Sequence, residues 1–233
     1  MISLTHCKNK KIFELGLGLS GDSAIRALES GGANVSAWDD SDRVRKNYFG
    51  QGKNIINPKE ISVEDFDVLF LSPGIDIEKS PQKKFIEEFR RKKKSIICDI
   101  QLFVDEISHR KRNDKIIMLT GTNGKSTTSM MIYHILDKLG KKVQVGGNIG
   151  SRGVLDLELS DQDITFIIEL SSYQIELSPN IKPDIGILLN ISPDHLDRHG
   201  DMDKYTGIKF DIFKHQNEDD IAIIGLGNIG SYL

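Results

Sequence analysis

Residues 115–139 read KIIMLTGTNGKSTTSMMIYHILDKL, and the rest of the chain is most easily understood from them. The apolar run at 115–119 predicts a buried strand, and the periodic apolar residues up to 139 predict a helix. The glycine-rich turn between them places Lys125 and Ser126 in the first turn of that helix, which is the layout of a phosphate-binding loop. Lys125 would supply a mobile charge for phosphates, and the Ser126 hydroxyl can bind magnesium. The stretch therefore predicts a site for a nucleoside triphosphate.

This loop is shorter than the commonest phosphate-binding loop, whose first glycine would fall at Leu119. A glycine turn before a helix can also cap the helix and bind nothing. Here the strand, both glycines, the Lys-Ser pair and the helix occur in the required order, which favours the phosphate site. The residues predicted to contact ATP are Gly121, Thr122, Asn123, Gly124, Lys125, Ser126 and Thr127.

Composition excludes several classes of protein. The 233 residues are enough for two compact domains, and a formal net charge of −3 gives no sign of a nucleic-acid or anionic-membrane partner. Cys7 and Cys98 are far apart and lack metal-ligand spacing, which argues against a disulfide framework and a zinc site. No apolar run reaches the ~18 residues of a membrane span, and no signal sequence is evident. A cytoplasmic protein is expected.

Another glycine motif, which comes first along the chain, lies near the N-terminus. The sequence GLGLSG at 16–21 follows a strand-like run at 10–15 and opens a helical pattern, and a second strand at 35–38 ends on Asp39. Such a unit, with an acidic residue about 20 positions after the glycines, predicts nucleotide binding and by itself suggests NAD. Glycine turns between strand and helix also arise for packing alone, so this motif is less specific than the phosphate-binding loop.

Further strands are predicted at 68–71 and 95–98, with a turn at 72–74. Ligands of open parallel sheets lie beyond the carboxyl ends of the strands, so this turn, the glycine motif and Asp39 should line one crevice. Residues 99–113 predict a connecting helix and linker. The expected division is a first domain at 1–99, a linker at 100–113 and a second domain at 114–233.

Polar residues also follow the predicted strands of the second domain. A strand at 164–168 ends on Glu169, which is where a magnesium ligand belongs beside a phosphate-binding loop. A strand at 183–190 leads to a segment containing Asp194, His195 and Asp197, and this cluster modestly favours a functional role. Residues 204–214 predict a helix that exposes Lys209.

Four motifs together resemble the Mur ligase family of cell-wall enzymes: TGTNGKST at 120–127, GGNIG at 146–150, ELSSYQ at 169–174 and NISPDHLDRHG at 190–200. The resemblance runs from the first glycine motif to Lys209. It implies an α/β protein in which a Rossmann-like domain binds the UDP part of the substrate, without NAD, and a parallel-sheet domain of the P-loop ATPase type binds ATP.

The resemblance implies ATP-dependent amide formation in peptidoglycan precursor synthesis. D-glutamate would be added to UDP-N-acetylmuramoyl-L-alanine through an acyl phosphate, with ATP and Mg²⁺ as cofactors and a monomer as the acting form. By likeness, the substrate contacts would be Leu19, Ser20, Asp39, Gly74, Asn148, Ser171 and His195. The metal ligands would be Ser126, Glu169, His195 and Lys209, the last as a carbamate. The catalytic residues would be Lys125, His195 and Lys209.

The end of the chain departs from the family pattern. Residues 221–233 predict a strand and then a second G-x-G-x-x-G with no helix after it, which cannot form a dinucleotide site. The expectation is an incomplete second domain, an absent C-terminal domain and no ligase activity of the chain alone. Three alternatives stay open at this point: a non-catalytic UDP-sugar-binding fragment, an NAD-dependent oxidoreductase, and a ligase similar to folylpolyglutamate synthase.

Overall fold

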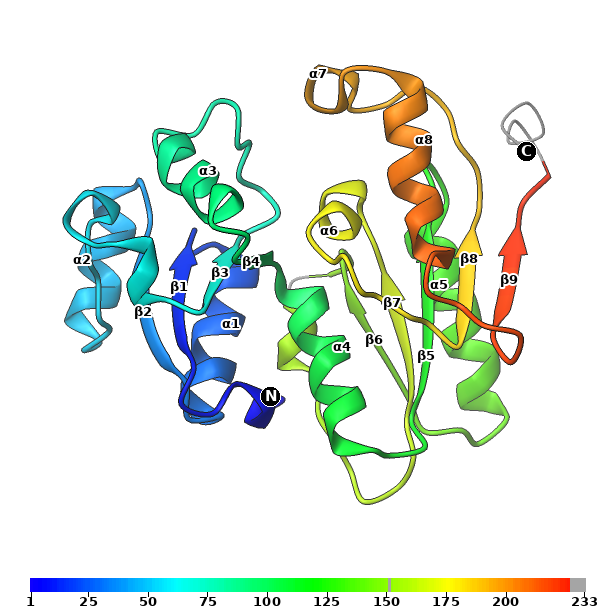
Figure 1. Cartoon of the computed structure of the whole chain (residues 1–233). Coiled ribbons are helices and arrows are strands. Elements are labelled where there is room, and N and C mark those ends of the chain that lie inside the picture. Colours follow the sequence, from blue (N-terminus) through cyan, green and yellow to red (C-terminus); the bar gives the residue numbers. More distant parts are fainter. Residues whose placement is uncertain (151, 227–233) are drawn as a thin grey trace.

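A computed structural model describes residues 1–150 and 152–226, and it contains two parallel β-sheets (Figure 1). The first sheet has the strand order β2-β1-β3-β4 and the second β6-β7-β5-β8-β9. Every strand pair in both sheets is parallel. The α/β class with parallel sheets that the sequence predicts is therefore confirmed. The domain limits at 99 and 114 stay a prediction.

The first sheet is built from short apolar segments that alternate with helices. Its strands are β1 (Lys11–Leu15), β2 (Asn34–Trp38), β3 (Val68–Leu71) and β4 (Ser95–Ile97). Its helices are α1 (Leu19–Ser30), α2 (Asp42–Gly50) and α3 (Lys83–Arg91). Strands that are covered on both faces read as continuous apolar runs, and this explains the sequence of β3, whereas β1 contains the buried Glu14.

The second sheet follows the same plan. Its strands are β5 (Lys115–Thr120), β6 (Val143–Gly147), β7 (Thr165–Glu169), β8 (Ile185–Leu188) and β9 (Ile221–Ile224). Its helices are α5 (Lys125–Lys138), α6 (Ser172–Glu176), α7 (Leu196–His199) and α8 (Met202–Phe210). Short 3-10 turns are η1 (Thr5–Cys7), η2 (Pro58–Glu60), η3 (Val63–Asp65), η4 (Val154–Asp156) and η5 (Asp211–Phe213).

The helix α4 (Asp99–Arg110) lies between the two sheets (Figure 1). Eight of its residues are buried, so it packs against neighbours on most of its circumference. One continuous core joins residues of both sheets through it, and the rings of Phe103 in α4 and Phe166 in β7 meet edge to face at 5.2 Å. The segment expected as a connecting helix is thus part of the core.

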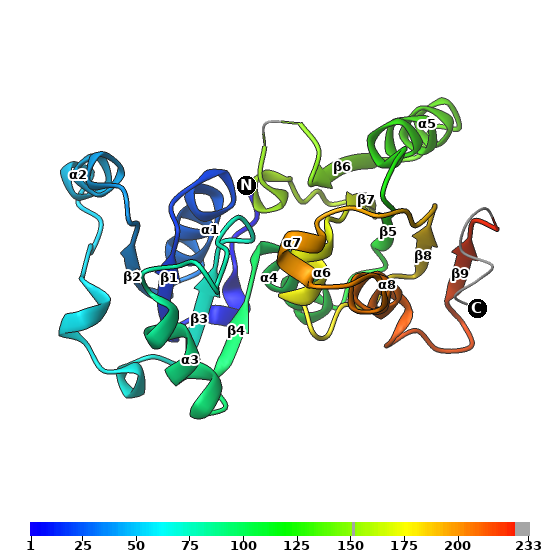
Figure 2. The same ribbon diagram turned by 90° about the horizontal axis from the view of Figure 1, so that it is seen from above.

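All strands of both sheets point the same way, so their carboxyl ends lie on one side of the molecule (Figure 1). The loop after β1 carries the first glycine motif and the loop after β5 carries the second. Figure 2 looks down on this side. Within the described residues no helix is long and apolar enough to cross a membrane. The C-terminal glycine motif continues past residue 226 and so lies largely outside the described residues.

Candidate nucleotide-binding site

Glycine allows the sharp turn of the loop between β5 and α5, and hydrogen bonds attach this loop to the residues that follow β8. Gly124 caps α5 with φ +83°, a left-handed conformation that suits glycine. The Asn123 N–H donates to Asn190 Oδ1 at 2.9 Å, and Asn190 Nδ2 donates back to the Asn123 carbonyl at 3.0 Å. The Thr122 N–H donates to the Asn190 carbonyl at 3.1 Å. These contacts fix the loop at the start of α5, where a helix attracts anions.

Two lysines point at one carbonyl oxygen inside this loop. Lys125 Nζ donates to the Gly121 carbonyl at 2.9 Å, and Lys209 Nζ donates to the same oxygen at 3.1 Å. Lys209 also donates to Thr120 Oγ1 at 3.2 Å. Burial, with a smaller effect from the Lys125 charge, lowers the pKa of Lys209 to about 7. The loop therefore concentrates positive charge with no carboxylate paired to either lysine among the described residues.

The burial of Lys209 corrects the prediction that its helix exposes it. The residue is 2% exposed, because α8 turns this side towards the loop after β5. The helix itself runs over Met202–Phe210 and continues as the 3-10 turn η5, close to the expected range of 204–214.

Three of the predicted residues meet at the Glu169 carboxylate. Ser126 Oγ donates to Glu169 Oε2 at 2.7 Å, and Asn148 Nδ2 donates to Oε1 at 3.3 Å. Glu169 is 2% exposed and ends β7, whereas Ser126 and Asn148 are exposed. The hydroxyl and carboxylate oxygens here are the hard donors that Mg²⁺ prefers, so the side chains fit that ion. No group of three or more His, Cys, Asp or Glu with metal-site geometry occurs in the described part of the chain.

His195 lies in the segment that follows β8. It has φ +51°, unusual for a residue other than glycine, and its N–H donates to Asp194 Oδ1 at 2.9 Å. Its ring lies 5.1 Å from that of Tyr173, which follows Ser171 at the start of α6. Within the described residues no hydrogen bond or ion pair joins His195 to Glu169 or Lys209. The structure thus brings His195 near α6, and its predicted metal contact stays a prediction.

The three segments predicted to line a crevice on the first sheet lie next to one another. Asp39 Oδ2 accepts a hydrogen bond from the Leu17 N–H at 2.8 Å, so the acidic residue supports the glycine loop. A Cβ at Gly16, where φ is +93°, would lie 2.8 Å from Ser72 Cβ, so the turn after β3 contacts the same loop. Leu19 and Gly74 are exposed beside it, and Ser20 is half-buried.

Three residues around the phosphate-binding loop were not among the predicted site residues. Asn190 pairs with the loop, Tyr205 OH lies 3.2 Å from Thr122 Oγ1, and Tyr173 packs against His195. Asn190 could have been found, because it is a polar residue at the end of a predicted strand. Tyr173 lies in the motif at 169–174 but was given no role there, and Tyr205 carried no signal, since buried aromatic residues are mostly core.

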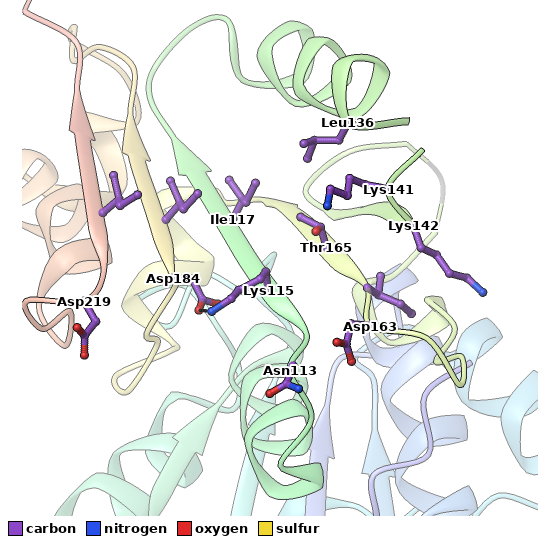
Figure 3. A pocket seen from close by; sticks show the side chains of 13 residues that line it. Asn113, Lys115, Ile117, Leu136, Lys141, Lys142, Asp163, Thr165, Asp184 and Asp219 are labelled. Carbon is purple, nitrogen blue, oxygen red and sulfur yellow. Dashed lines mark hydrogen bonds and ion pairs between the residues drawn. The ribbon is translucent and has the colours of Figure 1, made fainter. Parts of the chain in front are cut away.

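A separate cavity of about 550 Å³ lies at the amino ends of the second sheet's strands, opposite the glycine loops (Figure 3). It is lined by Ile117, Leu136 and Ile185 among others, and Lys115 points at Asp184 across it, with Nζ and Oδ1 2.7 Å apart. None of the predicted site residues lines this cavity. The candidate site is therefore the carboxyl edge of the sheets.

Comparison with known proteins agrees with the four motifs. Residues 119–229 match the model of the Mur ligase middle domain. The chain is 40% identical over 230 residues to UDP-N-acetylmuramoylalanine–D-glutamate ligase from Caulobacter sp. (strain K31), covering 97% of this chain and 48% of the relative. The ligase of the same name from Wolbachia pipientis wMel is 44% identical, covering 97% of this chain and 43% of the relative. The chain thus spans about half the length of these relatives.

A solved structure shows a related fold. UDP-N-acetylmuramate:L-alanyl-gamma-D-glutamyl-meso-diaminopimelate ligase from Neisseria meningitides superposes with a TM-score of 0.57 at 17% identity, covering 93% of this chain and 71% of that one. At this identity the likeness concerns the fold, and it agrees with the two parallel sheets described above.

Proposed function

Because this chain belongs to the Mur ligase family, we propose that it carries the substrate- and nucleotide-binding part of an ATP-dependent ligase that adds D-glutamate to UDP-N-acetylmuramoyl-L-alanine. Relatives 40% and 44% identical are named for that reaction. The observation that carries the proposal is the 2.7 Å contact between Ser126 and Glu169 beside two converging lysines.

The loop between β5 and α5 would hold the ATP phosphates. Its backbone N–H groups and the start of α5 favour anions. Lys125, which lies against the Gly121 and Thr122 carbonyls at 2.9 Å, would turn outward to the phosphates. This movement exchanges two backbone acceptors for charged ones, which form stronger hydrogen bonds.

Ser126 and Glu169 would hold Mg²⁺, which supplies positive charge for phosphate oxygens when it is bound. Glu169 already accepts hydrogen bonds from Ser126 and Asn148, so its carboxylate is oriented before any ligand arrives. Preorganised groups of this kind stabilise developing charge without a cost of rearrangement during the reaction.

Lys125, together with bound Mg²⁺, would let a substrate carboxylate approach the triphosphate. The two anions repel each other, and these positive charges offset that repulsion. With a pKa of about 7, Lys209 has a substantial fraction of neutral amine at neutral pH. A neutral amine is the form that combines with carbon dioxide, releasing a proton, so a carbamate at Lys209 is chemically accessible. An oxygen of that carbamate and a ring nitrogen of His195 would then be ligands of a second Mg²⁺ ion.

The crevice on the first sheet would hold the UDP part of the substrate. Asp39 supports the glycine loop through its contact with the Leu17 N–H, Leu19 and Gly74 are exposed, and Ser20 is half-buried. Asn148, Ser171 and His195 would position the sugar and its alanine arm from the second sheet. We further propose that the protein acts as a cytoplasmic monomer in cell-wall synthesis, and so in cell shape and division.

Calorimetric titration of the purified chain with ATP and Mg²⁺ tests the nucleotide site. Lys125→Ala should weaken binding by ~10-fold or more, since hydrogen bonds to charged groups contribute about 1.5–3 kcal/mol. Lys141→Ala, at the opposite end of the sheet, is the matched control and should bind as the wild type does. Unchanged binding by Lys125→Ala, or no binding by the wild type, would remove the ATP site from the proposal.

A further inference from the structure

Arg198 in α7 joins the second sheet's loops to the first sheet. Its Nη1 donates to the carbonyl of Pro73 at 3.2 Å, across 125 positions of sequence. Its guanidinium carbon lies 3.9 Å from the centroid of the Tyr173 ring. Figure 2 shows α7 on the side of the second sheet that faces the first sheet. A guanidinium that both stacks and donates is fixed in position and direction.

The Pro73 end of this contact lies against the glycine loop of the first sheet. The Ser72 N–H donates to the Leu15 carbonyl at 3.0 Å. A Cβ on Gly16 would be 2.8 Å from both Ser72 and Ile75, so the turn and the loop are in close contact. A ligand that orders the glycine loop must therefore also order the turn that Arg198 holds.

Tyr173, on which Arg198 stacks, is connected to the phosphate-binding loop through a series of ring contacts. The Tyr173 ring lies 5.1 Å from that of His195 and 5.2 Å from that of His199. His199 is buried against Tyr205 at 5.5 Å between ring centroids, and Tyr205 OH lies 3.2 Å from Thr122 Oγ1. Movement of α7 would therefore disturb both His195 and the loop that contains Thr122.

We propose that Arg198 is a positioning residue that couples the two sites, so that the UDP-linked substrate and the triphosphate bind more tightly together than separately. The inference rests on the proposed function, because it requires both ligands. Binding of one ligand would order the turn at 72–75, α7 and His195, and the second ligand would then find its site already arranged. Coupling between sites changes affinity by about 5–150-fold in typical proteins.

The test measures affinity for UDP-N-acetylmuramoyl-L-alanine by calorimetry, with and without saturating Mg²⁺ and a non-hydrolysable ATP analogue. Wild type should bind at least ~5-fold more tightly with the analogue present. Arg198→Met keeps an unbranched, largely apolar stem but is shorter and lacks the guanidinium charge and its N–H donors. It should bind each ligand alone within about twofold of wild type and lose the enhancement. Arg91→Met, on the exposed surface of α3, is the control and should keep it.

Tyr173→Leu removes the stacking surface while leaving Arg198 in place, and it should lose the enhancement too. This second variant tests the inference if Arg198→Met does not fold. Retained enhancement in a folded variant, or wild type that binds both ligands independently, would overturn the coupling and leave the proposed function standing. Failure of wild type to bind the UDP-linked compound at all would refute the proposed function and the coupling with it.

Discussion

Lys125 and Lys209 donate hydrogen bonds to the same carbonyl oxygen, that of Gly121, at 2.9 and 3.1 Å. Burial is the main reason that the pKa of Lys209 falls to about 7, and the Lys125 charge adds to it. The positive charge of Lys209, which α8 places against the phosphate-binding loop, therefore changes close to neutral pH. A buried ammonium without a carboxylate is costly in the absence of an anionic ligand.

Lys209→Met should raise the free energy of unfolding at pH 7 by ~1–4 kcal/mol, because it replaces a buried charge with an apolar side chain. The folded-state pKa is below the unfolded value of 10.5, so the wild type takes up a proton on unfolding between these values. Its stability should rise with pH from about 7 towards 10.5, and the advantage of the variant should shrink. Urea denaturation at several pH values in this range measures both.

The control for this experiment is Lys204→Met, an exposed lysine of the same helix, which should change stability by less than ~0.5 kcal/mol at every pH. An advantage of Lys209→Met that stays constant as the pH rises would mean that the ammonium charge is not the cause.

Glu169→Gln should abolish most of the contribution of Mg²⁺ to nucleotide binding. The amide keeps an oxygen for the Ser126 hydrogen bond but loses the charge that would bind the ion. Calorimetry of ADP with and without Mg²⁺ should show a metal-dependent gain in affinity for wild type that falls ~10-fold or more in the variant. Asp163→Asn, at the far end of the sheet, should keep the gain, and a Glu169→Gln protein that also keeps it would exclude Glu169 as a ligand.

Gly147→Ala should be much more damaging than Gly140→Ala, although both glycines have positive φ, of +90° and +72°. A Cβ at Gly140 meets nothing within 4 Å, so only the left-handed backbone opposes it, at about 1–2 kcal/mol. A Cβ at Gly147 would lie 2.2 Å from the Glu169 carbonyl oxygen, and the backbone must move, adding ~1–3 kcal/mol. Thermal and urea denaturation of the two variants measure their loss of stability. Equal losses would contradict the close approach of Gly147 to the Glu169 carbonyl at the end of β7.

Glu14→Leu should stabilise the chain at pH 7 by ~1–3 kcal/mol, the cost of a buried polar group without a partner. Glu14 is fully buried, and neither of its carboxyl oxygens has a hydrogen-bond partner among residues 1–150 and 152–226. Burial, and then the charge of Asp22, raises its pKa well above the usual 4.5. Folding therefore favours the protonated form, and wild-type stability should fall as pH rises above 4.5.

Denaturation of Glu14→Leu and wild type from pH 4.5 upwards checks this pH dependence. The difference in free energy of unfolding between the two proteins should widen as the pH rises. Glu60→Gln, an exposed carboxylate, should show no such widening. A gap that narrows would mean that Glu14 is ionised and paired in the folded protein.

Local sequence was sufficient for the strands, the two glycine loops and the meeting of Ser126 with Glu169. Both loops follow apolar runs, and the carboxyl ends of parallel strands lie at one edge, so polar residues after different strands come together. The contact between the first glycine loop, Asp39 and the turn at 72–74 follows from the same rule. These are consequences of strand direction and of backbone conformations that glycine permits.

Three features required the folded structure: the location of Lys209, the contact of Arg198 with Pro73 and the burial of Glu14. The residues of α8 lack a clean apolar stripe, so its sequence does not tell which side faces the loop after β5. Arg198 and Pro73 are brought together by the packing of the two sheets, to which α4 and the contacts of η4 with the first residues of the chain both contribute. Such contacts depend on how elements distant in the sequence pack, and periodicity within one element carries no information about that packing.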